Sequence, residues 1–441
     1  MRVLILTLIL ISTSLFCQNK DYKKYDKAVK HFNQKKNNKA KKLLLEILDR
    51  NSNWDSPNLL LAQILITEGD IQESIKYMLN AYDENDPNDK DGLEKIAKIY
   101  YQNGYYREAL KYFQLVIDYN LENIDPKIVL YKNNCIFSLN KMMDSIPVKL
   151  VNLGPNINTS FEEYLPAISI DGKTMVFSRR VRGDSDYMHE DFYVSIQDTN
   201  NNWQKSVLYP GRINTLGNEG AFSFSPNKEL VVYTACNRFD GEGRCDLYLF
   251  ANNISYNAGK KINTKYWESQ GCFSPDGKYL YFVSNRPGGY GGKDIWRSRI
   301  RNNNFLEPEN LGPNVNSAFD EMSPYIHPDN LTLYFASNGH LGFGDFDLFL
   351  SRRDSLNGEW GLVSNLGYPI NSFNIENSLI VLYDGETAYY TSNKLGFGQE
   401  DIFQFKLPIH LRANRISDLE VDIIQNVRGQ EIVLENVVFA T

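Results

Sequence analysis

Histidine and cysteine are scarce in this sequence of 441 residues, which has five of each. The histidines are scattered without the short spacing of metal ligands, at His31, His189, His327, His340 and His410. The nucleophile elbow G-x-S-x-G is also absent. These absences argue against zinc and serine-hydrolase sites, and we expect no catalytic residue, no metal site and no cofactor.

The chain also lacks an excess of positive charge. It has 47 Lys and Arg against 54 Asp and Glu, a net charge of −7. We therefore expect no nucleic-acid partner, because binding phosphates needs a basic surface. The segment YFVSNRPGGYGGKDIW at 281–296 has the glycines of a phosphate loop. However, Pro287 replaces the first glycine of that motif and Asp294 replaces its hydroxyl residue.

A long apolar run occurs only at the N-terminus, over residues 3–11, between Arg2 and a small polar stretch. This pattern is typical of a secretory signal peptide, here residues 1–17, and is too short to span a membrane. A lipid anchor on Cys17 is the less favoured alternative, because the bulky Phe16 precedes it. The sequence thus predicts an exported protein.

Export makes disulfides possible. Cys236 and Cys245 lie in YTACNRFDGEGRCDLY, where two strand-like runs flank a glycine-rich turn. Antiparallel pairing would bring them within bonding distance, so we predict a disulfide; two buried free thiols are the alternative. Cys135 and Cys272 have no evident partner and are expected in the core.

Residues 18–146 have helical periodicity and an internal repeat of 34–35 residues. Small residues recur at two positions, and glycines recur 35 residues apart at Gly69 and Gly104. The small residues are Ala28, Ala62 and Ala97 at one position and Ala40, Ser74 and Ala109 at the other. This spacing resembles the tetratricopeptide repeat, with a further helix around 128–139. It predicts an α-solenoid with a binding groove, and a purely structural spacer is the alternative.

Residues 147–407 contain five copies of a second unit of 48–55 residues. Each copy has an Asn, a Glu five residues later, an Asp or Asn eight after that, and a closing Asp before two apolar residues. The glutamates are Glu163, Glu219, Glu268, Glu321 and Glu376, and the closing aspartates are Asp191, Asp246, Asp294, Asp347 and Asp401. Strand, turn and strand within each copy are typical of a propeller blade; the turn is Asp-Gly in three copies and a weaker Asn227-Lys228 or Asp329-Asn330 in the other two.

The fold class predicted is therefore α plus all-β: a tetratricopeptide-like solenoid followed by a five-bladed β-propeller. Six blades are the alternative, although no segment of blade length remains for a sixth. The run 148–153 is available to close the ring by pairing beside the last copy.

Two roles are open for the repeated glutamates. They could form a ring of carboxylates at one mouth of the channel, or each could make the same structural hydrogen bonds in its own place. We favour the structural role, because catalytic groups are usually unique to one blade. The closing aspartates are expected to bond to the backbone of their glycine-rich loops.

Residues 311–350, LGPNVNSAFDEMSPYIHPDNLTLYFASNGHLGFGDFDLFL, resemble the WD40-like repeat of TolB-type propellers. Together with the helical repeats and signal peptide, the chain resembles bacterial envelope proteins that end in an OmpA-like, peptidoglycan-binding domain, one of which works in type IX secretion. Residues 408–441 resemble a linker and only the first strand of that domain. Peptidoglycan binding through the missing module is therefore not carried over.

The resemblance implies a periplasmic, outer-membrane-associated scaffold that binds envelope proteins. We expect it to be non-enzymatic. The alternative is a carbohydrate-active, glycosidase-like propeller or a peptide- or glycan-binding module, since some five-bladed propellers carry paired carboxylates at the axis.

Overall fold

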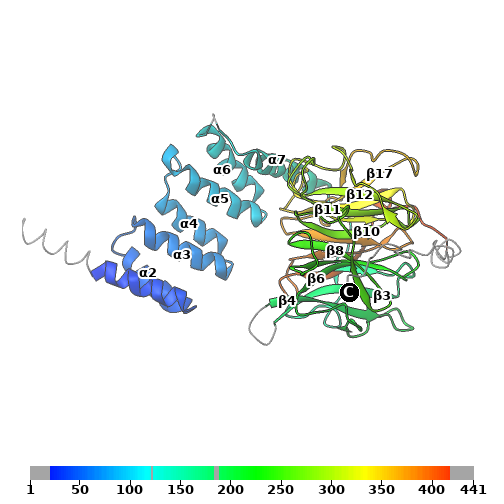
Figure 1. Cartoon of the computed structure of the whole chain (residues 1–441). Coiled ribbons are helices and arrows are strands. Elements are labelled where there is room, and N and C mark those ends of the chain that lie inside the picture. Colours follow the sequence, from blue (N-terminus) through cyan, green and yellow to red (C-terminus); the bar gives the residue numbers. More distant parts are fainter. Residues whose placement is uncertain (1–19, 121–122, 183–187, 418–441) are drawn as a thin grey trace, which may run out of the picture. The chain divides into compact units, whose positions relative to one another are not determined.

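The computed structural model describes residues 20–120, 123–182 and 188–417 (Figure 1). The predicted signal peptide and the predicted OmpA-like strand lie outside these residues. The chain divides into two compact units, Met1–Ile136 and Phe137–Thr441, and each is treated by itself.

The first unit is a helical repeat, as the sequence predicts. A helix over 20–33 precedes the other helices. These are α2 (Asn37–Leu48), α3 (Asp55–Glu68), α4 (Ile71–Ala81), α5 (Lys90–Gln102), α6 (Tyr106–Asp118) and α7 (Pro126–Lys141), with a 3-10 turn η1 (Pro87–Asp89) before α5. The pairs α3–α4 and α5–α6 pack as antiparallel hairpins, one per repeat.

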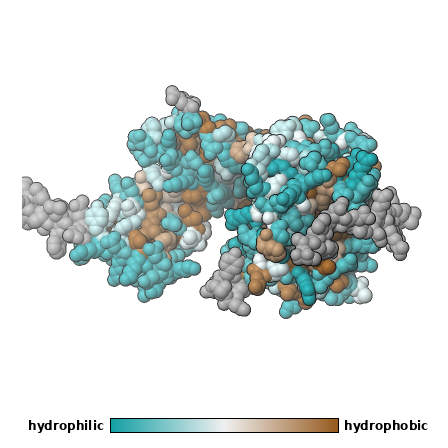
Figure 2. All heavy atoms as spheres, viewed as in Figure 1, coloured by the Kyte–Doolittle hydropathy of each residue, from teal (hydrophilic) through white to brown (hydrophobic). Residues whose placement is uncertain are grey.

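The recurring small residues make this packing possible. Ala28, Ala40, Ser74, Ala97 and Ala109 are fully buried, so the paired helices approach closely. Gly69 ends α3 with φ of +81°, and the Asp70 amide donates to the Leu65 carbonyl at 2.9 Å. Figure 2 shows apolar residues gathered over the middle of this unit, with polar residues around them.

The second unit contains five antiparallel sheets, the blades of the predicted propeller. Blade 1 comprises β2 (Glu162–Ile168), β3 (Thr174–Arg182), β4 (Met188–Ile196) and β5 (Val207–Leu208). Blade 2 comprises β6 (Asn218–Phe224), β7 (Val231–Cys236), β8 (Cys245–Ala251) and β9 (Ile254–Asn257). Blade 3 comprises β10 (Glu268–Phe273), β11 (Tyr279–Ser284), β12 (Asp294–Arg301), β13 (Asn304–Phe305) and β14 (Glu309–Asn310).

Blade 4 comprises β15 (Glu321–Ile326), β16 (Thr332–Ser337), β17 (Asp347–Arg352) and β18 (Ser364–Asn365). Blade 5 comprises β19 (Glu376–Val381), β20 (Thr387–Ser392) and β21 (Asp401–Lys406). Its fourth strand is β1 (Val151–Asn152), which pairs with β21 and closes the ring as predicted. Short 3-10 turns η2 (Met142–Asp144) and η3 (Ile409–Leu411) flank the propeller, and the described residues form no sixth blade.

The first strand of every blade lines one cavity of about 120 Å³, which identifies these strands as the wall of the central channel. Each of the five strands has a β-bulge whose residue adopts a positive φ, two residues after the repeated glutamate. These residues are Leu165, Ala221, Gln270, Ser323 and Ser378.

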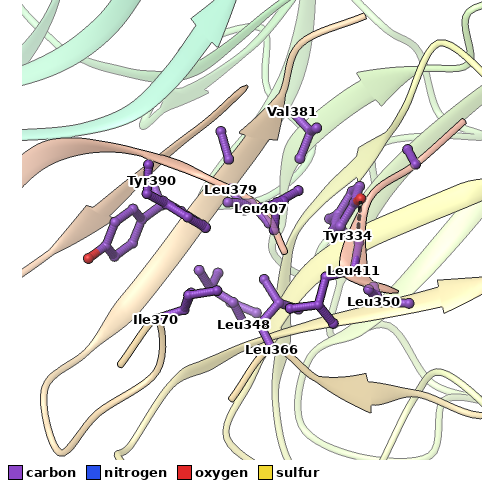
Figure 3. Packing of buried hydrophobic residues seen from close by; sticks show 14 of the residues in the cluster. Tyr334, Leu348, Leu350, Leu366, Ile370, Leu379, Val381, Tyr390, Leu407 and Leu411 are labelled. Carbon is purple, nitrogen blue, oxygen red and sulfur yellow. Dashed lines mark hydrogen bonds between the residues drawn. The ribbon is translucent and has the colours of Figure 1, made fainter. Parts of the chain in front are cut away.

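Apolar layers between neighbouring blades form the core. In Figure 3, Tyr334 and Leu348 of blade 4 face Leu379 and Tyr390 of blade 5. The Tyr334 hydroxyl donates to the Leu411 carbonyl at 2.8 Å, which holds the segment after β21 against this layer. The blades therefore form a rigid frame for the loops at the two ends of the strands.

Candidate binding site on the propeller

The five repeated glutamates are fully buried, and none lines the channel cavity. The Glu163 carboxylate accepts from the Thr159 amide at 2.8 Å and from the Thr159 hydroxyl at 2.6 Å. The other four make the same two bonds to a Thr or Ser four residues earlier, namely Thr215, Thr264, Ser317 and Ser372. The carboxylates thus fix the loop that enters each blade, and they do not form an open ring at a channel mouth.

Four of these carboxylates also face an arginine or a lysine that the repeat pattern did not predict. Arg179 Nε lies 2.6 Å from Glu163, and Lys394 Nζ lies 3.2 Å from Glu376. Arg238 and Arg286 pair with Glu219 and Glu268 at 3.0 and 3.3 Å. The sequence did carry a signal, because an Asn precedes the basic residue in Asn237-Arg238, Asn285-Arg286 and Asn393-Lys394.

Blade 4 is the exception, because the neighbour of Glu321 is a histidine. His340 Nε2 lies 3.9 Å from the carboxylate, and burial lowers the pKa of that histidine. Burial in turn raises the pKa of Glu321 to about 7. Burial also raises the pKa of Glu219 and of Glu376.

Four of the closing aspartates accept backbone amides of the glycine-rich loop before them. Asp294 accepts from the Gly291 amide at 3.1 Å, and Asp401 from the Gly398 amide at 3.0 Å. Asp246 and Asp347 accept the equivalent amides of Gly243 and Gly344. Asp191 instead faces His189 Nε2 at 3.1 Å.

The asparagine of the repeat joins neighbouring blades. Asn158 accepts from the Ile402 amide at 2.9 Å and donates to the Ile402 carbonyl at 2.9 Å, a contact between blades 1 and 5. Asn214, Asn263, Asn316 and Asn371 make the same pair of bonds to the preceding blade. Sequence periodicity identified these asparagines but not this role.

The cysteines fall into two groups. Cys236 and Cys245 are directly opposite on β7 and β8 and form a disulfide. Cys135 and Cys272 are buried free thiols. Cys272 lines the channel cavity, and burial raises the pKa of its thiol to about 11, so it is a poor nucleophile.

The repeat is broken by a group of carboxyls in blades 1 and 5, which we call the acidic cluster: Glu162, Glu190 and Glu400. Arg180 lies on β3, directly opposite Glu162 of β2 and Glu190 of β4. Its Nη1 is 3.2 Å from the Glu162 carboxylate. Glu400 comes from the loop before β21, and its carbonyl accepts the Glu163 amide.

The electrostatics of the acidic cluster are strongly perturbed. Burial, and then the charges of Glu162 and Glu190, raise the pKa of Glu400 to about 7, and Arg180 opposes the shift. Burial and the charge of Glu190 also raise the pKa of Tyr164. All three carboxyl side chains remain partly exposed, so the cluster is open to ligands.

A buried hydroxyl without a protein partner points into the same place. Ser178 is fully buried, and its Oγ makes no hydrogen bond. A methyl group added to Gly220 would lie 3.5 Å from that oxygen and 3.4 Å from Oε2 of Glu190. The equivalent of Ser178 in blade 2, Thr234, bonds the Ser269 hydroxyl at 2.9 Å instead, whereas the equivalent in blade 5, Thr391, also lacks a hydrogen-bond partner.

The loops at this end of the blades also carry exposed apolar residues. The register of Asn218 with Cys236 places the loop before β6 and the loop after β7 on one face, and the repeat extends this to every blade. We call it the loop face. Leu216, Phe239 and Leu395 are fully exposed on it, and Tyr290, Leu341 and Phe397 are about half-exposed.

Neither a protein-family model nor a curated protein sequence matches the chain. Solved structures do match. A TolB-like protein from Agrobacterium tumefaciens is 17% identical, covering 59% of this chain and 98% of its own, with a TM-score of 0.31. An endo-arabinanase from Bacillus licheniformis is 13% identical over 56% of this chain and 94% of its own, with a TM-score of 0.39. The first tetratricopeptide domain of Spaghetti (RPAP3) is 14% identical over 28% of this chain and 94% of its own, with a TM-score of 0.23. These likenesses concern the fold alone.

One prediction is corrected by these matches. The sequence was interpreted as that of a non-enzymatic protein, yet several matched propellers are arabinofuranosidases as well as the arabinanase. Within the described residues, no three His, Cys, Asp or Glu side chains are placed to share a metal ion, and no helix could cross a membrane.

Proposed function

We propose that this chain is a binding scaffold of the bacterial envelope, which holds partner proteins through its helical repeat and the loop face of its propeller. The observation that carries the proposal is the exposure of Leu216, Phe239 and Leu395. Single exposed apolar residues are common, but large ones repeated on one face are typical of a protein-interaction surface.

The frame beneath these residues supports the same conclusion. The buried glutamates and closing aspartates fix the backbone of these loops, so the positions from which the apolar side chains project are set before a partner binds. A preorganised surface binds with a smaller loss of conformational entropy than a loose one. The helical repeat adds a second surface of the kind that usually binds peptides.

An envelope location, associated with the outer membrane, and a place in secretion machinery are parts of this proposal. They follow from the resemblance of the repeats and the signal-like N-terminus to envelope scaffolds. A carbohydrate-active propeller remains the alternative function, and its ligand class is tested below.

Photo-crosslinking in the native envelope tests the proposal. A photo-reactive residue replaces Leu216, Phe239 or Leu395 in turn, and Lys173 and Lys278, exposed on turns at the opposite strand ends, serve as controls. We expect one discrete protein adduct from the loop-face positions and none from the controls. Equal labelling from both faces, or no adduct from any position, would overturn the proposal.

A further inference from the structure

The acidic cluster is unique to one region of a repetitive molecule. The residue before the closing aspartate is a glutamate only in blades 1 and 5, where it is Glu190 and Glu400; in blades 2, 3 and 4 it is Cys245, Lys293 and Phe346. The structural frame therefore does not require acids here. This is the pattern expected of a ligand site added to a repeat.

The cluster carries more negative than positive charge. Arg180 is in register with Glu162 and Glu190 and pairs with Glu162, and its side chain is 46% exposed. Its charge also lowers the pKa of Glu400, so one base serves three carboxyls. Carboxylates that lack a counter-charge repel one another, and the raised pKa of Glu400 reflects this repulsion together with burial. A cationic ligand group would relieve it.

A polar group inside the cluster also awaits a partner. The buried Ser178 hydroxyl and the Glu190 carboxylate both border the space over Gly220, at 3.5 and 3.4 Å from the position of a methyl group there. A side chain at this position would fill that space. Because Ser178 is fully buried, a ligand group can reach its hydroxyl only by entering there.

The spacing of the carboxyls selects the kind of cation. Among the described residues no three acidic side chains are close enough to hold one metal ion. An organic cation with several N–H donors, such as a guanidinium or ammonium group, can reach acceptors that are further apart.

We propose that Glu162, Glu190 and Glu400 bind the side chain of an arginine or lysine from a partner protein, with the Ser178 hydroxyl as a further acceptor. The inference deepens the proposed scaffold function, because it rests on a protein partner and states the partner's chemistry. The loop face would supply apolar contact, and the cluster would select a basic residue.

Titration calorimetry on the whole chain at low ionic strength tests the site. The probes are capped tri-arginine and tri-lysine peptides, with capped tri-glutamine and maltotriose as neutral probes. We expect a cationic peptide to bind and the neutral probes not to bind. Glu190→Gln, Glu400→Gln and Gly220→Ala should each weaken binding at least about tenfold. Glu309→Gln, which changes an exposed carboxylate paired with Arg297 in blade 3, should leave binding unchanged.

The Gly220→Ala variant keeps every charge and only fills the space over the glycine. Its affinity for the cationic peptides therefore still tests the site if a glutamine variant unfolds. No binding of the cationic peptides, or equal binding by all variants, would overturn the inference. Binding of maltotriose that is lost in the same variants would overturn it in favour of a glycan site. None of these outcomes affects crosslinking from Leu216, Phe239 or Leu395. The scaffold proposal is therefore tested independently of this inference.

Discussion

Four of the five buried glutamates of the propeller form an ion pair with an arginine or a lysine, and the free energy of each pair depends on how deeply its partner is buried. Glu163 and Arg179 are both almost completely buried, and Arg179 also stacks on Tyr193 with its guanidinium carbon 4.1 Å from the ring centre. Removing one partner from such a pair leaves the other charge uncompensated. The ion pair and the stacking of its basic partner therefore explain why the glutamate recurs, although burying a carboxylate costs free energy.

Glu163→Gln should lower the free energy of unfolding by about 3 kcal/mol, because it leaves the Arg179 guanidinium buried beside a neutral amide. Chemical denaturation measures the loss. The neighbouring Glu162→Gln is the matched control. Its partner Arg180 is 46% exposed, so the loss there should stay below about 1 kcal/mol. Equal losses in the two variants would contradict the structural role of Glu163.

Glu321 gives the propeller a pH dependence. Its folded-state pKa of about 7 lies above the ordinary value of 4.5 for a glutamate, so the folded protein holds an extra proton between these two pH values. The stability from this proton is fully present below about pH 4.5 and is lost as the pH rises through 7.

The glutamine variant isolates this effect, because glutamine resembles the protonated acid. Relative to the parent, Glu321→Gln should gain about 2–3 kcal/mol in free energy of unfolding between pH 5 and pH 8. Denaturation of both proteins across this range measures it. A difference that does not change with pH would show that Glu321 ionises normally in the fold.

At the scale of elements, the fold was largely predictable and the site was not. The Asp-Gly turns of blades 3 and 5 and the glycine at the end of α3 are local signals, and each lies where it was expected. The acidic cluster joins Glu162, Glu190 and Glu400 from two blades that are adjacent only because the ring closes. No local pattern marks such a site, although non-repeating acids at repeating positions could have suggested it.

The asparagine between blades is an element-scale contact that can be tested. Asn263→Ala removes both bonds to Leu247 and leaves the buried Leu247 amide unpaired, while the Leu247 carbonyl keeps the Ala258 amide as its donor. We expect a loss of about 2–3 kcal/mol in unfolding free energy. Asn200→Ala, in an exposed turn, should cost almost nothing. A small loss at Asn263 would mean that apolar packing alone holds the blades together.

The disulfide between β7 and β8 predicts a simple labelling result. Thiol alkylation of the unfolded, unreduced protein should modify Cys135 and Cys272 but neither Cys236 nor Cys245. After reduction all four should react. Mass spectrometry of the peptides reads this out, and labelling of Cys236 without reductant would contradict the bond.

At the scale of the whole molecule, the sequence indicated two repeat domains. Each has a sequence period longer than one helix or strand, 34–35 residues in the first and 48–55 in the second. The closing of the ring by β1 was also predictable, since a run of strand-forming residues was left before the first blade. The prediction of a non-enzyme failed because it took repetition as evidence about function. The repeated residues specify the blades, and the proposed ligand site uses residues that depart from the repeat, namely Glu190 and Glu400.

The central claim is that the loop face binds a partner protein. Co-purification from the envelope, with the partner quantified by mass spectrometry, tests it most directly. The triple variant Leu216→Ser, Phe239→Ser and Leu395→Ser should keep the melting temperature of the parent, because these side chains are fully exposed, and should lose the partner. A control with Lys173→Ser and Lys278→Ser should retain it. If the triple variant is folded and recovers as much partner as the parent, the loop face is not the binding surface.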